Sequence, residues 1–129
     1  MKRILGLAAA VLLLAGCAPA PTPDKPIDSL VYYQYQAIED FDDSEYTQHE
    51  PSQVARFVEL LEEYDVVPGV TITTVEDNCA GGISTTVTVN YADNSSADMF
   101  IAACGEPDYD EFNSAATALF SEWRSEAAG

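Results

Sequence analysis

The N-terminal segment decides which part of this chain can fold into a domain. Lys2 and Arg3 precede an unbroken apolar run over residues 4–15, and the small residue Gly16 follows it. This arrangement is typical of a secretory signal peptide. The run would cover about 18 Å as a helix, well short of the roughly 30 Å of a bilayer core, so it is too short to span a membrane. Folding is therefore expected only in the chain that follows.

The end of the apolar run carries a second signal. Residues 14–17 read Leu-Ala-Gly-Cys, which resembles the lipobox of bacterial lipoproteins. In that class the Cys receives a diacylglyceryl group, the signal is cut just before it, and two or three acyl chains hold the protein stably at the membrane. The resemblance implies that Cys17 is the lipid attachment site of a protein at the extracytoplasmic face of the cell membrane. The alternative is an ordinary secretory signal in which Cys17 has no such role.

A proline-rich tether is expected after Cys17. Residues 18–26 read Ala-Pro-Ala-Pro-Thr-Pro-Asp-Lys-Pro, a composition that favours an extended polyproline II conformation reaching roughly 28 Å. We therefore divide the chain into a lipoprotein signal peptide at 1–16, a lipidated Cys and tether at 17–27, and a single small extracytoplasmic domain at 28–129.

The charge of the exported chain restricts its partners. Loss of Lys2 and Arg3 with the signal leaves three basic residues against all 22 acidic ones, a formal charge of −19. Such a field repels nucleic acid and anionic headgroups, so we expect no nucleic-acid partner and membrane contact only through the lipid on Cys17. A cationic envelope protein or peptide is the partner that this charge favours, and solubility alone is the alternative explanation.

Six carboxylates gather in residues 39–50. An EF-hand loop that began at Asp40 would need glycine at its sixth position and glutamate at its twelfth, where this chain has glutamate and proline, so that motif is absent. A looser cation site formed by Asp40, Asp42 and Asp43 and a solvated charge run both fit the pattern. His49, the sole histidine, is expected to be a surface residue.

Two segments predict helices. Pro51 suits the first position of a helix, and apolar residues then recur at helical spacing until Pro68-Gly69. A second helix is expected from Asp108 to about Glu126, because its apolar residues trace one face. The apolar stripes are Val54, Phe57, Val58, Leu61 and Tyr64 in the first helix, and Phe112, Ala115, Ala116, Leu119, Phe120 and Trp123 in the second.

Four segments predict strands. Residues 30–38 alternate and are rich in Val and Tyr, although a helix beginning near Pro26 would also place their apolar residues plausibly. Residues 70–76, 83–91 and 97–104 are separated by turn sequences and predict an antiparallel meander. In its middle strand, Thr85, Val87 and Val89 are expected on a buried face, and Thr86 and Thr88 on a wet face.

The two remaining cysteines are predicted to form a structural disulfide. In the meander, the turn after its first strand holds Cys79 and the end of its third strand holds Cys104, at the same edge. An even pair of cysteines in an exported protein is positioned to bond when Cys17 carries lipid.

The expected fold is α+β, with an antiparallel sheet of three or four strands, the order β-α-β-β-β-α, and both helices packed on one face. The sheet face that the helices cover is expected to bear Val70, Ile72, Val87, Val89 and Ile101.

The sequence contains no recognisable catalytic or cofactor motif. It has no HExxH, nucleophile elbow, phosphate loop or glycine fingerprint, so we expect no catalytic residues and no cofactor. The function that fits best is a small acidic binding module on the membrane. The alternatives are a cation-binding sensor domain and a small carboxylate-dependent hydrolase.

Overall fold

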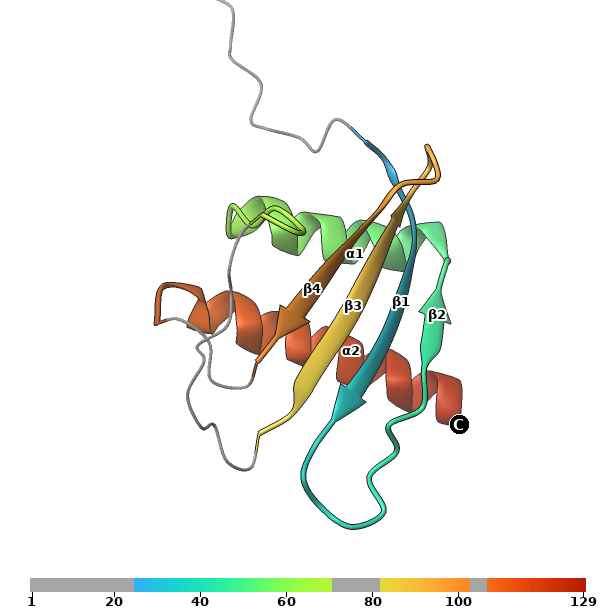
Figure 1. Ribbon diagram of the computed structural model, residues 1–129, viewed down its shortest axis with the longest axis vertical. Helices are drawn as coiled ribbons and strands as arrows, with labels where there is room; N and C mark the ends of the chain where they lie inside the picture. Colours follow the sequence, from blue (N-terminus) through green and yellow to red (C-terminus); the bar gives the residue numbers. More distant parts are fainter. Residues whose placement is uncertain (1–24, 71–81, 103–106) are drawn as a thin grey trace, which may run out of the picture.

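Four strands and two main helices form the part of the chain that the structure describes, residues 25–70, 82–102 and 107–129 of a computed structural model (Figure 1). In chain order the elements are β1 (Ile27–Tyr35), β2 (Tyr46–Gln48), α1 (Pro51–Glu63), β3 (Ser84–Tyr91), β4 (Ser96–Ile101), the short 3₁₀ helix η1 (Pro107–Tyr109) and α2 (Asp110–Ala128). A four-stranded antiparallel sheet with two helices confirms the predicted α+β class.

The molecule has two layers. Both helices cross the same face of the sheet, and the opposite face carries no helix among the described residues (Figure 1). The helices begin and end close to where the sequence predicted, because Pro51 fixes the start of α1 and helical spacing of apolar residues continues to its last turn.

The sheet has the strand order β2-β1-β3-β4, and every neighbouring pair is antiparallel. In the centre of the sheet, Tyr33 of β1 lies opposite Thr86 of β3, which in turn lies opposite Phe100 of β4. A tight turn joins β3 to β4, with Asn94 in the left-handed region at φ 68°, a conformation that Asn tolerates better than most residues. The register therefore aligns side chains from three strands in rows.

The first strand begins and ends earlier than predicted. We expected it over 30–38, whereas β1 covers Ile27–Tyr35. Its pairing partner explains the shift, because β3 pairs with β1 from Tyr91, opposite Ile27, to Ser84, opposite Tyr35. Beyond Tyr35 no further β3 residue is available, and the chain turns. The alternative helix near Pro26 is absent.

Along the described chain the main elements follow the order β-β-α-β-β-α, with one strand before α1 that we did not predict. The short strand β2 lies within the carboxylate-rich segment 39–50, where we predicted no strand, and β3 has β1 and β4 as its two neighbours. Of the predicted strand at 70–76, Val70 lies in a turn and is 74% exposed, so its predicted place in the core is wrong. Residues 71–76, which include Ile72, lie outside the described residues.

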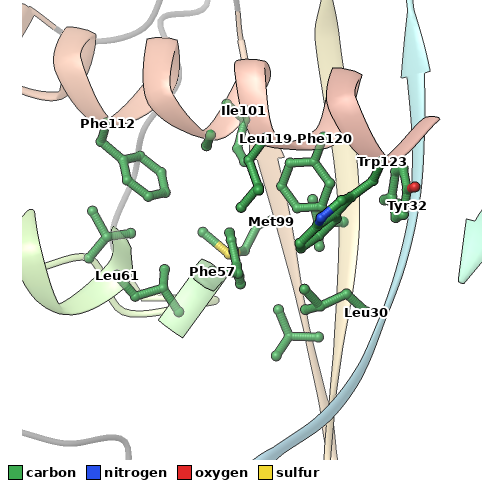
Figure 2. Close-up of a cluster of buried hydrophobic side chains, with 14 residues drawn as sticks. Leu30, Tyr32, Phe57, Leu61, Met99, Ile101, Phe112, Leu119, Phe120 and Trp123 are labelled. Atoms are coloured by element: carbon green, nitrogen blue, oxygen red, sulfur yellow. The ribbon is translucent and has the colours of Figure 1, made fainter. Parts of the chain in front are cut away.

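The core lies between the sheet and the two helices (Figure 2). Phe120 contacts the rings of Tyr32, Phe57 and Trp123 at centroid distances of 5.0, 5.4 and 5.1 Å. As predicted, Val87 and Val89 are fully buried. Rings in tilted and edge-on contact at these distances contribute about 0.5–1.5 kcal/mol per pair beyond area burial, so this aromatic cluster fixes how α2 sits on the sheet.

A polar bridge joins the two helices at the edge of the core. The Trp123 indole Nε1–H donates to Gln53 Oε1 at 2.9 Å. Arg56 binds both carboxylate oxygens of Glu122, at 2.7 and 3.0 Å. The bidentate geometry sets the register between α1 and α2.

Candidate interaction surface

The sheet face opposite the helices is solvent-accessible, and we call it the open sheet face. Alternation along each strand places every second side chain on it, and the burial of those residues agrees, because none of them is buried. Its members are Ser29, Val31, Tyr33 and Tyr35 of β1, Thr47 of β2, Ser84, Thr86, Thr88 and Asn90 of β3, and Ser96, Asp98 and Phe100 of β4.

Aromatic side chains line the centre of the open sheet face. Tyr33 and Phe100 flank Thr86 from the two neighbouring strands and are 38% and 48% exposed, and Tyr35 at the end of β1 is 52% exposed. Large apolar residues this exposed occur singly on many proteins, but a row across three strands is a contiguous patch of the kind that marks an interaction site.

The open sheet face is almost uncharged, in contrast to the rest of the chain. Among its described residues, Asp98 alone is charged, and its carboxylate accepts a hydrogen bond of 2.9 Å from the Thr88 hydroxyl. The chain as a whole carries 22 acidic residues. Depletion of charge together with enrichment in Tyr and Phe is the composition of an interface core.

Residues 36–45 connect β1 to β2 and hold five of the six carboxylates of segment 39–50, and we call this connection the acidic loop. It lies at the end of β1 opposite the chain's entry into the sheet (Figure 1). The Phe41 ring packs under the Arg124 guanidinium, whose Cζ is 4.5 Å from the ring centroid. Asp42 accepts hydrogen bonds from the Ser44 backbone N–H and the Tyr46 hydroxyl. The loop is therefore fastened to both β2 and α2.

The hydrogen bonds that Asp42 accepts make its carboxyl group a stronger acid. Bonds from Ser44 and Tyr46 favour the ionised carboxylate and lower the pKa of Asp42 from 3.8 to about 2. The same contact raises the pKa of Tyr46. Asp42 thus acts as an anchor for the loop in its charged form at neutral pH.

The weak metal candidates do not gather into a ligand set in the structure. Asp40, Asp42 and Asp43 all lie in the acidic loop, but within the described residues no three His, Cys, Asp or Glu side chains are arranged to hold a metal ion. Asp42 is already bound by protein donors. His49 is exposed, in agreement with its predicted place on the surface.

Each basic side chain that remains after Gly16 is engaged within the domain. Lys25 lies 3.1 Å from an Asp93 carboxylate oxygen, Arg56 pairs with Glu122, and Arg124 packs on Phe41. The domain therefore offers many carboxylates to a partner, whereas its three basic side chains already make contacts within the domain.

The three cysteines lie outside the described residues. The predicted lipid attachment at Cys17 and the predicted disulfide between Cys79 and Cys104 remain predictions. No described helix is both long enough and apolar enough to cross a membrane.

One buried polar cluster lies between the sheet and α2. The Gln34 amide donates to the Thr85 hydroxyl at 3.2 Å and to the Thr117 carbonyl at 3.4 Å, and its oxygen accepts from Ser121 at 3.2 Å. Gln34 and Thr85 are fully buried. Because these groups satisfy one another beneath the sheet, the cluster specifies packing and does not form a reactive site.

No family model, curated protein or solved structure matches this chain. The fold and the open sheet face define the class, a small acidic α+β domain with one helix-covered and one accessible sheet face.

Proposed function

We propose that this chain is a lipid-anchored extracytoplasmic binding module, held at the cell membrane through Cys17, that engages a basic protein partner through the open sheet face. The observation that carries the proposal is the row of Tyr33, Thr86 and Phe100 across three strands, on a face that is almost free of charge.

The contacts of the first described residues support a defined orientation of the domain relative to the lipid anchor. The Ala92 N–H donates to the Pro26 carbonyl at 2.9 Å, and Lys25 pairs with Asp93, so both contacts fix the chain beside the β3–β4 turn. From there β1 runs to Tyr35 over about 30 Å at the usual strand rise. With a lipid on Cys17, the β3–β4 turn is the membrane-proximal end, and the acidic loop lies at the distal end.

The composition of the open sheet face supports protein binding. Tyrosine and phenylalanine provide large, rigid contact areas, and their loss from water on docking is the main favourable contribution at an interface core. Thr86, which lies between Tyr33 and Phe100, supplies a hydroxyl that can pair with a polar group of a partner.

The charge supports a basic partner. A formal charge of −19 on the exported chain attracts cationic surfaces over a Debye length of about 8 Å at 0.15 M salt and repels acidic ones. Lysine or arginine of the partner can also pack on the exposed rings of Tyr33, Tyr35 and Phe100 by cation–π contact. Because the domain's own cations are engaged internally, complementarity requires positive charge from the other side.

The anchor is tested by replacing the lipidated residue. Cys17→Ser expressed in a native host should lose metabolic lipid label and leave the membrane fraction or stay unprocessed, because the thioether is the proposed anchor. The wild type, labelled in parallel, should carry lipid and remain at the membrane. A processed wild type that carries no lipid would refute the anchor without bearing on the binding surface.

The binding surface is tested by affinity capture from a detergent extract of the cell envelope. The Tyr33→Ser/Phe100→Ser variant should lose a basic binding partner that the wild type captures, because it removes the aromatic row. The matched control is Ile38→Ser/Val70→Ser, which removes side chains that are 57% and 74% exposed but lie outside the strands that form the open sheet face. Capture should also fall steeply as salt rises. Equal capture by both double variants would contradict the assigned surface.

A further inference from the structure

Apart from the open sheet face, the domain has a concave surface where the start of β1 meets α1, at the end of β1 opposite the acidic loop. This groove, which we call the α1–β1 groove, has a volume of about 750 Å³, and its lining includes the apolar side chains of Ile27, Val54 and Val58. Because α1 covers the other side of the sheet, the groove is separate from the open sheet face (Figure 1).

The groove is elongated along α1. The helix contributes residues from Pro51 through Val54 and Val58 to Glu62, which succeed one another at helical spacing. At 1.5 Å per residue this stripe is about 16 Å long. An extended chain rises about 3.3 Å per residue, so about five residues of an extended peptide match its length.

The groove carries unbalanced negative charge. Asp28, Glu59 and Glu62 contribute to its lining. Among the described lining residues Lys25 is the one lysine or arginine, and it already pairs with Asp93 at 3.1 Å and donates to the Ser95 hydroxyl at 3.2 Å. His49 also contributes to the lining. An occupant that brings both apolar and cationic groups is therefore complementary to this surface.

We propose that the α1–β1 groove binds a short extended peptide segment of a partner protein, in which apolar side chains alternate with lysine or arginine. Alternation in an extended chain directs the apolar side chains to one side, toward Ile27, Val54 and Val58. The long basic side chains on the other side reach back along their aliphatic stems to the carboxylates at the rim. A small amine is a poorer fit than a peptide, because it would leave most of the stripe along α1 uncovered; that stripe is about 16 Å long at the helical rise of 1.5 Å per residue. This site goes beyond the proposed function, because it does not use the open sheet face.

Calorimetric titration with defined peptides tests the proposal. The protein is the lipidated chain in phosphatidylcholine nanodiscs, with empty nanodiscs as the blank, and the probes are the capped pentapeptides Leu-Lys-Leu-Lys-Leu and Leu-Glu-Leu-Glu-Leu. The basic peptide should bind and the acidic one should not. Glu59→Gln/Glu62→Gln should weaken binding of the basic peptide about 3- to 10-fold, the range for loss of two exposed ion pairs.

The matched control neutralises two carboxylates at the end of the same helix but outside the groove. Glu63→Gln/Asp65→Asn changes the net charge equally, and neither residue lines the groove, so it should weaken binding by less than about twofold. Equal effects of the two double variants, or equal binding of the two peptides, would overturn the proposal.

A third variant separates this site from the proposed function. Tyr33→Ser/Phe100→Ser should leave the affinity for the basic peptide unchanged. If this variant alone abolishes binding, the peptide lies on the open sheet face, which overturns the groove proposal while it supports the proposed function. If the groove variant alone weakens binding, the groove is confirmed independently of whatever the open sheet face binds.

Discussion

Replacing Phe120 by alanine should remove the centre of the core. Its ring is fully buried and contacts Tyr32, Phe57 and Trp123 from three different elements. Truncation of a buried phenylalanine costs about 3–5 kcal/mol, out of a typical domain stability of about 5–15 kcal/mol. At about 4–8 °C per kcal/mol for a domain of this size, the melting temperature should fall by at least about 12 °C.

The matched control is Phe100→Ala, the same change on the open sheet face. Phe100 is 48% exposed, so its loss should change the free energy of unfolding by only about 0.5 kcal/mol. Urea unfolding followed by fluorescence measures both variants, because Trp123, the sole tryptophan, is buried beside Phe120. A loss for Phe100→Ala as large as that for Phe120→Ala would show that the open sheet face is covered, and would refute its role as a binding surface.

Four further predictions follow from single features. Val87→Asp should abolish cooperative unfolding, because it places an unpaired charge at a fully buried position, and a soluble variant with a sharp melting transition would contradict this. Asp42 stabilises the fold above about pH 4, and this contribution should be lost as the pH falls toward the lowered pKa of about 2. In acid titrations, the stability of Asp42→Asn should therefore fall less steeply with pH over that range than the stability of the wild type. Parallel curves for the two proteins would contradict the role of Asp42 as the anchor of the acidic loop. The exported wild type should yield linked Cys79 and Cys104 peptides, and reduction should add the mass of two hydrogen atoms and lower stability by about 3.5 kcal/mol, whereas free thiols at both positions would disprove the disulfide. Millimolar calcium should leave the melting temperature unchanged. If the domain had a calcium site, calcium at a hundred times the dissociation constant would raise the free energy of unfolding by about 2.7 kcal/mol.

The helices and the β3–β4 pair could be predicted from the sequence because local patterns specify them. Pro51 and the regular apolar stripe define α1, and strict alternation in β3 separates Val87 from Thr86. The bounds of β1 could not be predicted, because they depend on how far β3 extends beside it. Strand β2 has only three residues and lies in a charged segment, so it exists through its pairing with β1 and not through its own propensity.

The candidate surface was harder to predict than the fold. The acidic residues dominate the sequence, and the structure places Asp42 in hydrogen bonds that fasten the loop. Tyr32 and Tyr33 are adjacent and of the same type, yet one is in the core and the other on the open sheet face. Only the register across β1, β3 and β4 brings Tyr33 and Phe100 to either side of Thr86, and that register is a long-range property.

The most direct test of the binding module is photo-crosslinking in intact cells. A photoreactive phenylalanine analogue is placed at Thr86, in the centre of the open sheet face, and in a matched chain at Ala118, an exposed residue of α2. The account predicts one defined adduct with a basic envelope protein from position 86 and none from position 118, with the adduct lost in the Tyr33→Ser/Phe100→Ser background. An adduct from position 118 alone, or none from a membrane-anchored chain labelled at position 86, would contradict it.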